Sequence, residues 1–473
     1  MQLDQDLSAR QEARDLSARA VQAQKILGTF SQEKLDGIVK AMAEAFAAEA
    51  DNLAKMAVEE TGFGNFQSKV QKNLFAAQKV LSAMEGMKTV GILKKKPGLW
   101  EIGVPVGVIA GIVPSTNPTS TVCYKALISL KAGNTIVFSP HPKALRCTLR
   151  AAEILEQAAL RAGAPEGCVQ CLTIASLAGC QELMGAKQVR LIRATGGPGM
   201  VKAAYSSGKP AIGVGAGNGP AYIHHSADVR QAMEAILASK TFDNGTVCAS
   251  EQSIIVEEPM EQQVRETGRK LGFYFMNEQE AGRLGKLLFR PSGALNPDIV
   301  GKSAAYLAEK AGFPVPENTH VLVAREQEAG PTRPYSMEKL CPVLAFFVME
   351  NEDAVLSKAI EVLTLEGSGH TFAIHAEDPE VIEKFARQIP VSRFLVNTPA
   401  ALGGIGATTG LFPALTLGCG AVGGSSSSNN ISPMDLINIR RVAWGTEEAP
   451  HKKPEVPDDL VERLTEQILK RLG

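Results

Sequence analysis

Three short segments of the chain carry side chains that could do carbonyl chemistry. The first, TFDNGTVCASEQS at residues 241–253, contains Cys248 among small and amide residues, directly after an Asn-Gly pair. No second cysteine is near enough in sequence to act as a metal or disulfide partner. A cysteine in a partly exposed setting that lowers its pKa is a nucleophile, and small neighbours leave room for a substrate. An ordinary core cysteine is the alternative interpretation.

The second segment, GVIAGIVPSTNPTS at residues 107–120, predicts a buried strand that runs into a polar turn. The strand ends at Pro114, and the turn exposes Ser115, Thr116 and Asn117 before a helix. An asparagine amide at such a strand end can donate to an oxyanion, a contribution of about several kcal/mol in acyl chemistry. The alternative is an Asn-Pro turn with a purely conformational role.

The third segment, RATGGPGMVKAA at residues 193–204, is a glycine-rich turn between a strand and a helix. The strand is expected to end at Arg193–Ala194, and the helix to start near Pro198. Backbone N–H groups at a helix start can bind phosphate, because the free donors and the helix dipole point the same way. A plain tight turn is the alternative, and the spacing differs from the G-x-G-x-x-G dinucleotide fingerprint.

Alternating strands and helices must position these segments. Residues 5–87 have apolar residues at helical spacing, which predicts two or three amphipathic helices. From about residue 90, β-rich runs such as VGVIAGIVPS, NTIVFSP and VRLIRATG alternate with helical segments. A second such pattern covers 226–415, with strands at SIIVEE, HVLVAR, LAFFVME, TFAIHA and RFLVN. Together they predict an α/β fold with doubly wound, parallel sheets.

The C-terminal part changes in composition twice. The glycine- and serine-rich segment after residue 415 is flanked by apolar residues, which predicts an ordered return strand with a bend. Proline and charge at 445–456 predict a solvated linker, and residues 457–473 predict a separate amphipathic helix. A helix this short is marginal alone, so its apolar stripe needs a partner. That partner is either the enzyme itself, in this or a sister subunit, or another protein.

The bulk composition excludes some classes of partner. The chain has 473 residues, 45% of them hydrophobic and 21% charged, as in soluble globular proteins. A formal net charge of −1 gives no electrostatic reason to expect nucleic acid or an anionic membrane. Neither an apolar signal core nor a membrane-spanning run is present, so we expect a cytoplasmic location with the 8 cysteines as free thiols.

Seven motifs in order over residues 20–445 carry a family resemblance. They are IVPSTNPTS, ATGGPGM, GVGAGNGP, NGTVCASEQS, EKLCPV, GSGHTFAIH and TLGCGAVGGSSSSNNISP. The chain resembles the aldehyde dehydrogenase superfamily, specifically its coenzyme A-acylating branch, which includes the propionaldehyde and acetaldehyde dehydrogenases of bacterial microcompartments. The resemblance implies an aldehyde dehydrogenase-like fold, with a dinucleotide-binding domain, a catalytic domain and a β-arm for oligomerisation.

The same resemblance divides the chain into segments. The dinucleotide-binding domain is expected to combine the N-terminal helices of 1–87 with residues 104–225. Residues 88–103 would form the oligomerisation arm together with a return segment at 416–444. The catalytic domain with the nucleophilic cysteine is expected at 226–415, and the helix at 457–473 resembles an encapsulation peptide.

The resemblance also assigns roles to single residues. Cys248 matches the nucleophile, and Asn117 matches the oxyanion donor that works beside the backbone N–H of Cys248. Glu338 matches the glutamate that holds the nicotinamide ribose, with an ordinary exposed glutamate as the alternative. No metal site is implied. The full set expected around the cofactor is Pro114, Ser115, Thr116, Ser139, Pro140, His141, Thr195, Gly196, Gly197, Gly199, Gly215, Glu338 and Leu340.

Two departures separate the chain from the hydrolytic members of the family. Those members have a glutamate that activates water, and aligning the motif ELGGKSP with GVGAGNGP places Val214 at its position. Valine cannot act as a general base. Where hydrolytic members have a lysine after a strand, this chain has Ser139 and then His141. His370, in GSGHTF, could contribute to catalysis, although a packing role is the favoured interpretation.

The expected function is therefore a CoA-acylating aldehyde dehydrogenase with NAD as cofactor and coenzyme A as co-substrate. A short aldehyde such as propionaldehyde or acetaldehyde would form a thioester on Cys248, which coenzyme A then takes up. The resemblance further implies a homodimer or homotetramer and a microcompartment shell protein as a partner. The alternatives are a hydrolytic aldehyde dehydrogenase and an inactive structural relative that recruits partners through its tail.

Overall fold

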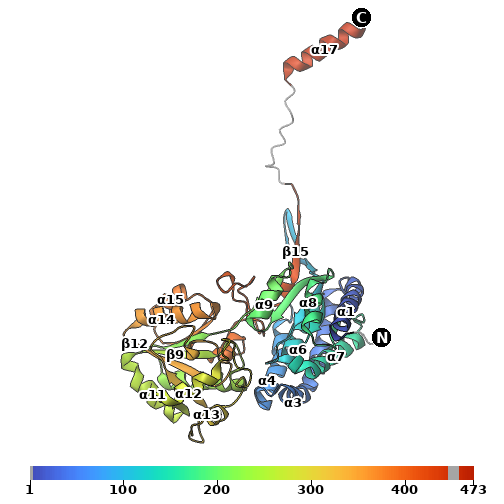
Figure 1. Cartoon of the computed structure of the whole chain (residues 1–473). Helices are drawn as coiled ribbons and strands as arrows, with labels where there is room; N and C mark the ends of the chain where they lie inside the picture. Colours follow the sequence, from blue (N-terminus) through green and yellow to red (C-terminus); the bar gives the residue numbers. More distant parts are fainter. Residues whose placement is uncertain (1–3, 446–456, 473) are drawn as a thin grey trace.

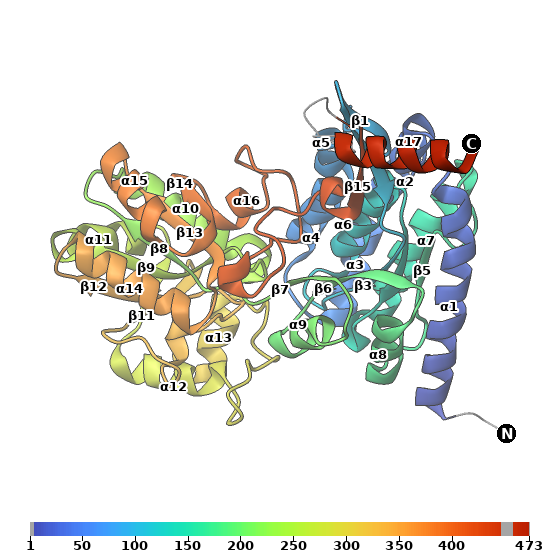
Figure 2. The same cartoon turned by 90° about the horizontal axis from the view of Figure 1, so that it is seen from above.

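Residues 4–445 and 457–472 are described by the computed structural model, and most of them form two α/β lobes that lie side by side (Figures 1 and 2). The first lobe, in blue and green, combines the N-terminal helices with a five-stranded sheet. The second, in yellow and orange, is built on a seven-stranded sheet. The α/β fold expected from the sequence is confirmed.

The N-terminal helices form part of the first lobe and begin at well-defined caps. Asp4, Ser31 and Asn65 each accept a backbone N–H at the start of a helix, which satisfies donors that have no partner within the helix. A π-helical turn at Phe75–Lys79 interrupts the last helices. The helices are α1 (Gln5–Leu27), α2 (Gln32–Ala48), α3 (Ala50–Thr61), α4 (Phe66–Leu74) and α5 (Val80–Ala83).

The sheet of the first lobe is parallel, with strand order β5-β4-β3-β6-β7. The strands are β3 (Val108–Ile112), β4 (Thr135–Ser139), β5 (Val169–Cys171), β6 (Val189–Thr195) and β7 (Ala211–Val214). The helices between them are α6 (Pro118–Lys131), α7 (Leu145–Arg161), α8 (Leu177–Gly185) and α9 (Pro198–Tyr205). The chain reverses its direction across the sheet between β3 and β6. Ligands of open α/β sheets bind at such a switch point, outside the carboxyl ends of the strands.

The sheet of the second lobe is also parallel, with strand order β10-β11-β12-β9-β8-β13-β14. Its strands are β8 (Gly219–Ile223), β9 (Glu251–Glu257), β10 (Phe273–Phe275), β11 (Val321–Arg325), β12 (Val343–Met349), β13 (Gly369–His375) and β14 (Val391–Val396). Its helices are α10 (Val229–Thr241), α11 (Glu261–Lys270), α12 (Glu278–Leu288), α13 (Ala304–Ala311), α14 (Glu352–Leu365), α15 (Pro379–Gln388) and α16 (Ala400–Gly404). The β10 strand has only three residues and was not predicted.

A four-residue connection joins the two sheets and corrects the expected domain boundary. We expected the first domain to extend to residue 225, but β8 pairs with β9 and β13 of the second sheet. The short strand β7, missed in the sequence, ends at Val214, and residues 215–218 lead directly into β8. Four residues span at most about 14 Å. The carboxyl edge of the first sheet must therefore lie close to the amino edge of the second.

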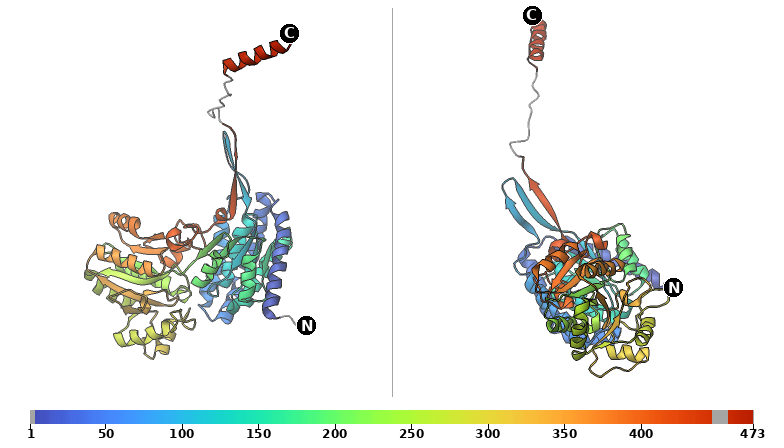
Figure 3. Two further views of the ribbon diagram at one scale, coloured as in Figure 1. Left: turned by 45° about the horizontal axis from the view of Figure 1, so that its top comes forward. Right: turned by 90° about the vertical axis from the view of Figure 1, so that its left-hand side faces the viewer.

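A three-stranded antiparallel arm projects from the lobes (Figure 3). It consists of the hairpin strands β1 (Gly91–Lys96) and β2 (Leu99–Pro105) and the distant strand β15 (Ile437–Ala443), which pairs with β2. The return strand expected after the glycine-rich segment is β15, and β2 extends two residues beyond the expected arm. The rings of Trp100 and Trp444 lie 5.1 Å apart edge to face.

The C-terminal helix is present as α17 (Asp458–Leu472), and the predicted linker falls almost entirely on residues 446–456, outside the described part of the chain. Apolar side chains of α17 are exposed, among them Val461, Leu464 and Ile468. Among the described residues, no helix has the length and apolar character that crossing a membrane requires. The 8 cysteines are all free thiols.

Candidate active site

Two adjoining cavities lie at the switch point of the first sheet. One, of about 320 Å³, contains Cys248, and the other, of about 380 Å³, extends over the ends of β4 and β6. They share Pro114, Thr195 and Gly196 in their walls. Every residue expected from the sequence to form the site lines one of the two: Pro114, Ser115, Thr116, Asn117, Ser139, Pro140, His141, Thr195, Gly196, Gly197, Gly199, Gly215, Cys248, Glu338 and Leu340.

Cys248 lies in the loop between the 3-10 turn Phe242–Gly245 and β9, and its side chain is half-buried against the cavity. We expected a setting that lowers the thiol pKa, and this expectation is wrong. Burial raises the pKa of Cys248 to about 12, and Glu338 adds to the rise, whereas Arg393 opposes it. A strand rather than a helix follows the loop, so Cys248 does not itself lie at a helix start.

Asn117 occupies the N-cap position of α6, yet its side chain makes no capping hydrogen bond. Its Nδ2 donates to the carbonyl oxygen of Thr246 at 3.1 Å, and its Oδ1 accepts from Lys72 Nζ at 2.6 Å. The amide therefore links the loop after β3 to the loop that carries Cys248, and it lines the same cavity as the thiol. A purely conformational asparagine would instead cap its own helix.

A buried ion cluster that was not predicted from the sequence contacts the loop that carries Asn117. Lys69 and Lys72, three residues apart on α4, both contact Asp243 Oδ2, at 2.6 and 2.5 Å. Lys69 also donates to the carbonyl oxygen of Thr116 at 2.7 Å. The two lysines and the aspartate are visible in the sequence, but their separation of more than 170 residues hides the contact.

The glycine-rich turn lies where phosphate binding was expected. β6 ends at Thr195, and α9 begins at Pro198 after Gly197, whose N-cap position has no side-chain cap. A Cβ added at Gly197, Gly199 or Gly215 would meet nothing within 4 Å, so open space adjoins the turn. Free backbone donors beside open space at a helix start fit a pyrophosphate group.

The end of β4 forms the second wall of this region. Ser139 is buried, and the exposed His141 accepts the Lys143 N–H at Nδ1, at 3.0 Å. Partial desolvation of its ring and the nearby Lys143 lower the pKa of His141. The His141 imidazole therefore becomes protonated at a lower pH than the imidazole of a free histidine.

Glu338 is buried, so the alternative of an ordinary exposed glutamate is wrong. Its Oε1 accepts the backbone N–H of Gly217 at 2.9 Å, and its own N–H donates to Glu366 Oε2 at 2.8 Å. Burial, with a further contribution from Glu366, raises the pKa of Glu338 to about 8. Among the described residues that line the Cys248 cavity, Glu338 is the one carboxylate.

Val214 ends β7, is buried and lines the cavity of Cys248. His370, by contrast, lies within β13 and is fully buried, with Nδ1 at 2.9 Å from Thr371 Oγ1. Burial lowers the pKa of His370 to about 3, so the ring is neutral at physiological pH. It is absent from the walls of the Cys248 cavity, which supports the packing interpretation.

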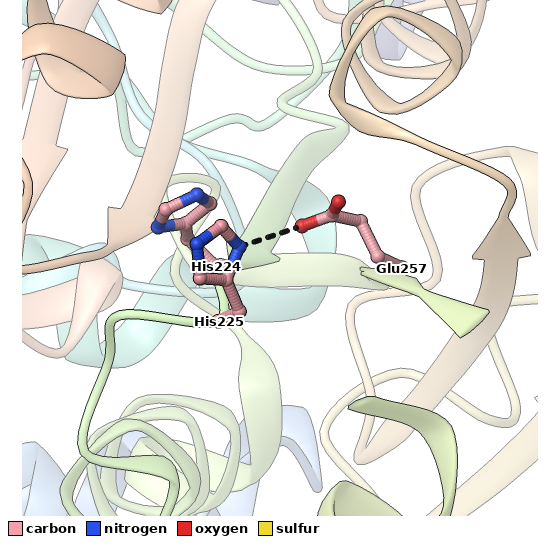
Figure 4. Close-up of side chains that lie close together, drawn as sticks. All are labelled: His224, His225 and Glu257. Carbon is pink, nitrogen blue, oxygen red and sulfur yellow. Dashed lines mark hydrogen bonds and ion pairs between the residues drawn. The ribbon is translucent and has the colours of Figure 1, made fainter. Parts of the chain in front are cut away.

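A second cluster of titratable side chains lies at the opposite end of the second sheet (Figure 4). His224 and His225 follow β8, and His225 Nδ1 is 3.4 Å from Oε1 of Glu257, the last residue of β9. The Ser226 N–H donates to His224 Nδ1 at 3.2 Å, which leaves the proton of the neutral ring on Nε2. This cluster ties β8 to β9 and takes no part in the Cys248 cavity.

Comparisons with known proteins agree with this geometry. A family model described as the aldehyde dehydrogenase family matches residues 4–270. Aldehyde-alcohol dehydrogenase 2 of Entamoeba histolytica is 44% identical over 456 residues, which are 94% of this chain and 52% of that protein. The chain thus spans about half the length of that curated relative.

Solved structures with the same architecture cover nearly the whole chain. An acetylating aldehyde dehydrogenase from Geobacillus thermoglucosidasius has a TM-score of 0.93 and 49% identity, covering 95% of this chain and 100% of that one. The propionaldehyde dehydrogenase of Rhodopseudomonas palustris, solved with bound CoA and an acylated cysteine, has a TM-score of 0.83 and 28% identity, covering 91% and 97%. The chain therefore belongs to the aldehyde dehydrogenase family, and its relatives include acylating members.

Proposed function

We propose that the protein is a CoA-acylating aldehyde dehydrogenase that converts a short-chain aldehyde, NAD⁺ and CoA into an acyl-CoA, NADH and a proton. The observation that carries the proposal is the composition of one cavity wall. A thiol, Cys248, and an amide donor, Asn117, lie there together, while valine stands where a water-activating glutamate would be needed. The acylated cysteine and bound CoA of the R. palustris relative support the same chemistry.

In the proposed mechanism, the Cys248 sulfur attacks the aldehyde carbon, and the resulting oxyanion accepts a hydrogen bond from Asn117 Nδ2. Bound NAD⁺ supplies the hydride acceptor. Loss of hydride leaves a thioester on Cys248, and the thiol of CoA displaces the acyl group. The Cys248 thiol must lose its proton before attack, and its raised pKa makes this an unfavourable step in the free protein.

The cofactor would be held by residues of both lobes. The backbone donors at Gly196 and Gly197 and the start of α9 fit its pyrophosphate, as the open space at the turn indicates. Glu338 is buried between the lobes and would hold a ribose hydroxyl. Ser139 and His141 lie at the end of β4, where no acidic residue selects NAD over NADP by binding a free ribose hydroxyl.

The cavity wall also favours a small, uncharged substrate. Lys72 is the one lysine or arginine among the described lining residues, and its Nζ already donates to Asn117, Asp243 and Thr246, so it has no donor left for a substrate anion. Much of the remaining wall is apolar and would repel an anionic tail. The apolar residues include Phe63, Val247, Leu295, Pro297, Val300, Leu415 and Leu417. Propionaldehyde and acetaldehyde suit this wall.

The decisive experiment follows NADH formation from C2–C6 aldehydes with and without CoA, using both NAD⁺ and NADP⁺. Steady turnover should require CoA, with a drop of at least about tenfold when it is withheld. Without CoA, intact mass spectrometry should show one acyl group on the chain and none on Cys248→Ala. Free acid as the main product in the presence of CoA would contradict the proposal and favour a hydrolytic enzyme.

Assembly and location form a second part of the proposal. The arm exposes Ile92, Ile439, Val442 and Trp444, which would pack against a sister subunit in a homodimer or homotetramer. The exposed stripe of α17 would bind a shell protein of a bacterial microcompartment. Removing residues 446–473 should leave the specific activity unchanged and abolish co-purification with shells. Loss of solubility on removal would instead show that α17 packs on the enzyme.

A further inference from the structure

Lys72 contacts Asn117, the proposed oxyanion donor, and the proposed mechanism gives this lysine no role. It is buried on α4, and its Nζ contacts Asn117 Oδ1 at 2.6 Å, Asp243 Oδ2 at 2.5 Å and Thr246 Oγ1 at 3.2 Å. It also lines the cavity that contains Cys248. The ammonium group of this α4 residue thus contacts both the loop after β3 and the loop before β9.

This contact and one with Thr246 determine which way the Asn117 amide points. A lysine ammonium has three donors and no acceptor, so the Asn117 atom beside it must be the carbonyl oxygen Oδ1. Nδ2 then faces the other way, where one N–H is taken by the Thr246 carbonyl oxygen. Nδ2 also donates to Thr116 Oγ1 at 3.4 Å, a long contact that an oxyanion in the cavity can replace. The Thr246 carbonyl oxygen favours the same orientation, because only the NH2 group can donate to it, and without Lys72 this single contact would have to orient the amide.

The position of Lys72 is itself held by a rigid anchor. Asp243 has a left-handed backbone, with φ at 49°, and its Oδ1 accepts the Asn65 N–H at 2.9 Å. A Cβ on Gly64 would lie 1.9 Å from Asp243 Oδ1, so only glycine leaves room for this carboxylate. Ser68 also accepts the Asp243 N–H. The position of the Asp243 carboxylate is therefore fixed by contacts other than the one to Lys72.

The cluster also has an unbalanced charge. Lys69 and Lys72 contact a single carboxylate, Asp243, so one positive charge remains beside the cavity when both lysines are protonated. Burial lowers the pKa of Lys72 to about 8, while Asp243 and Cys248 oppose the fall. In a poorly solvated site, a positive charge favours a thiolate and an oxyanion.

We infer that Lys72 is a positioning residue for the oxyanion donor: its ammonium orients the Asn117 amide toward the reacting carbonyl, and the net charge of the Lys69–Lys72–Asp243 cluster favours the anion formed there. The inference rests on the proposed function, because the oxyanion belongs to that reaction. It assigns to α4 a part in catalysis that no motif in the sequence indicates.

The test compares Lys72→Met with Lys69→Met. Each variant leaves one lysine paired with Asp243, so both lose the same charge, but only Lys72→Met removes the contact to the amide. We expect Lys72→Met to lower kcat by about 100-fold with the aldehyde KM within about threefold of wild type, and Lys69→Met to lose several-fold less. Lys79→Met, on an exposed lysine, should match wild type. Equal losses in the two buried variants would overturn the positioning role.

A double-mutant cycle provides a readout that general destabilisation does not mimic. Asn117→Ala and Lys72→Met should each cause a large loss, and the double variant should lose no more than about threefold beyond the worse single variant. Multiplied losses would overturn the inference. If Lys72→Met does not fold, the same double-mutant cycle is measured with Lys72→Gln in its place.

The rate of Cys248 alkylation by iodoacetamide, measured from pH 6 to 10.5, tests the electrostatic part independently of turnover. Glu338, Cys419 and Arg393 face the thiol in every variant, so a difference reports the lysine. Because the pKa of Lys72 is about 8, Lys72→Met should slow alkylation by about threefold or more below pH 8, and this difference should shrink as the pH rises towards 10.5. An unchanged profile would overturn the electrostatic part. A wild type that reduces no NAD⁺ with any aldehyde would refute the proposed function, while the alkylation profile would still decide the role of Lys72.

Discussion

A Cβ atom at position 217 would lie 1.9 Å from the carbonyl oxygen of Cys248, so Gly217 permits the nucleophile's loop to lie against the connection between the two sheets. The same Gly217 donates its N–H to Glu338. One glycine therefore sets the spacing between the thiol loop and the residue proposed to hold the cofactor ribose.

Gly217→Ala should consequently displace the Cys248 loop. We expect a loss of kcat/KM of at least about 100-fold and a fall in unfolding free energy of about 1–3 kcal/mol, as in overpacked cores. Steady-state kinetics and urea unfolding measure the two effects. Gly37→Ala on α2, where a Cβ meets nothing within 4 Å, serves as the matched control and should be neutral or slightly stabilising. Wild-type kinetics in Gly217→Ala would show that the loop can move without cost.

Val214→Glu should convert part of the acyl transfer into hydrolysis. The new carboxylate would enter the cavity that contains Cys248, where it could deprotonate water. We expect CoA-independent release of free acid to rise by about tenfold or more. Val214→Gln, with the same shape and no base, should show no such rise. Equal hydrolysis by the two variants would mean that Val214 does not protect the thioester.

Asn117→Asp should lower kcat at least as much as Asn117→Ala does, although aspartate differs from asparagine only in having an oxygen in place of the NH2 group. The carboxylate retains the contact with Lys72 but replaces the Nδ2 donor with an acceptor that faces the oxyanion. We expect a loss in kcat of about 10²–10³-fold for either change, measured as the burst of NADH in a single turnover. Substantial activity in Asn117→Asp would argue against oxyanion donation by this side chain.

Glu338→Gln should separate cofactor binding from thiol reactivity. An ionised Glu338 raises the pKa of Cys248, and the pKa of Glu338 itself is about 8, so this effect grows above that pH. The variant should therefore be alkylated by iodoacetamide faster than wild type above pH 8, while its KM for NAD⁺ rises. Alkylation rates that coincide with wild type from pH 8 to 10 would count against this coupling.

Acid should destabilise the second lobe through its buried histidines. Burial lowers the pKa of His375 to about 4 from an ordinary value near 6.5. Between these values the unfolded chain binds a proton that the native chain does not, so stability present above pH 6.5 falls as the pH falls. The slope is at most about 1.4 kcal/mol per pH unit for each such histidine.

Urea unfolding of wild type and His375→Gln at pH 7 and pH 4.5 tests this pH dependence. The variant should lose less stability on acidification, because glutamine binds no proton in either state. Parallel losses in the two proteins would show that other groups, such as paired carboxylates, account for the acid sensitivity.

The sequence alone determined the elements and the individual reactive side chains. The alternation of apolar strands with helices predicted the parallel sheets, because strand and helix periods are local properties of the chain. Cys248, Asn117 and the glycine-rich turn were recognisable for the same reason, since each lies in a short segment with its own turn chemistry. The valine at position 214 also followed from motif alignment alone.

Only the tertiary structure decided how these segments meet. It assigned β8 to the second sheet, because strand pairing depends on neighbours far along the chain. It showed that burial raises the pKa of Cys248, which depends on all the groups packed around the thiol. Above all, it brought Lys72 to Asn117 and Asp243, since a contact between distant segments follows from how whole helices and sheets pack and leaves no local pattern.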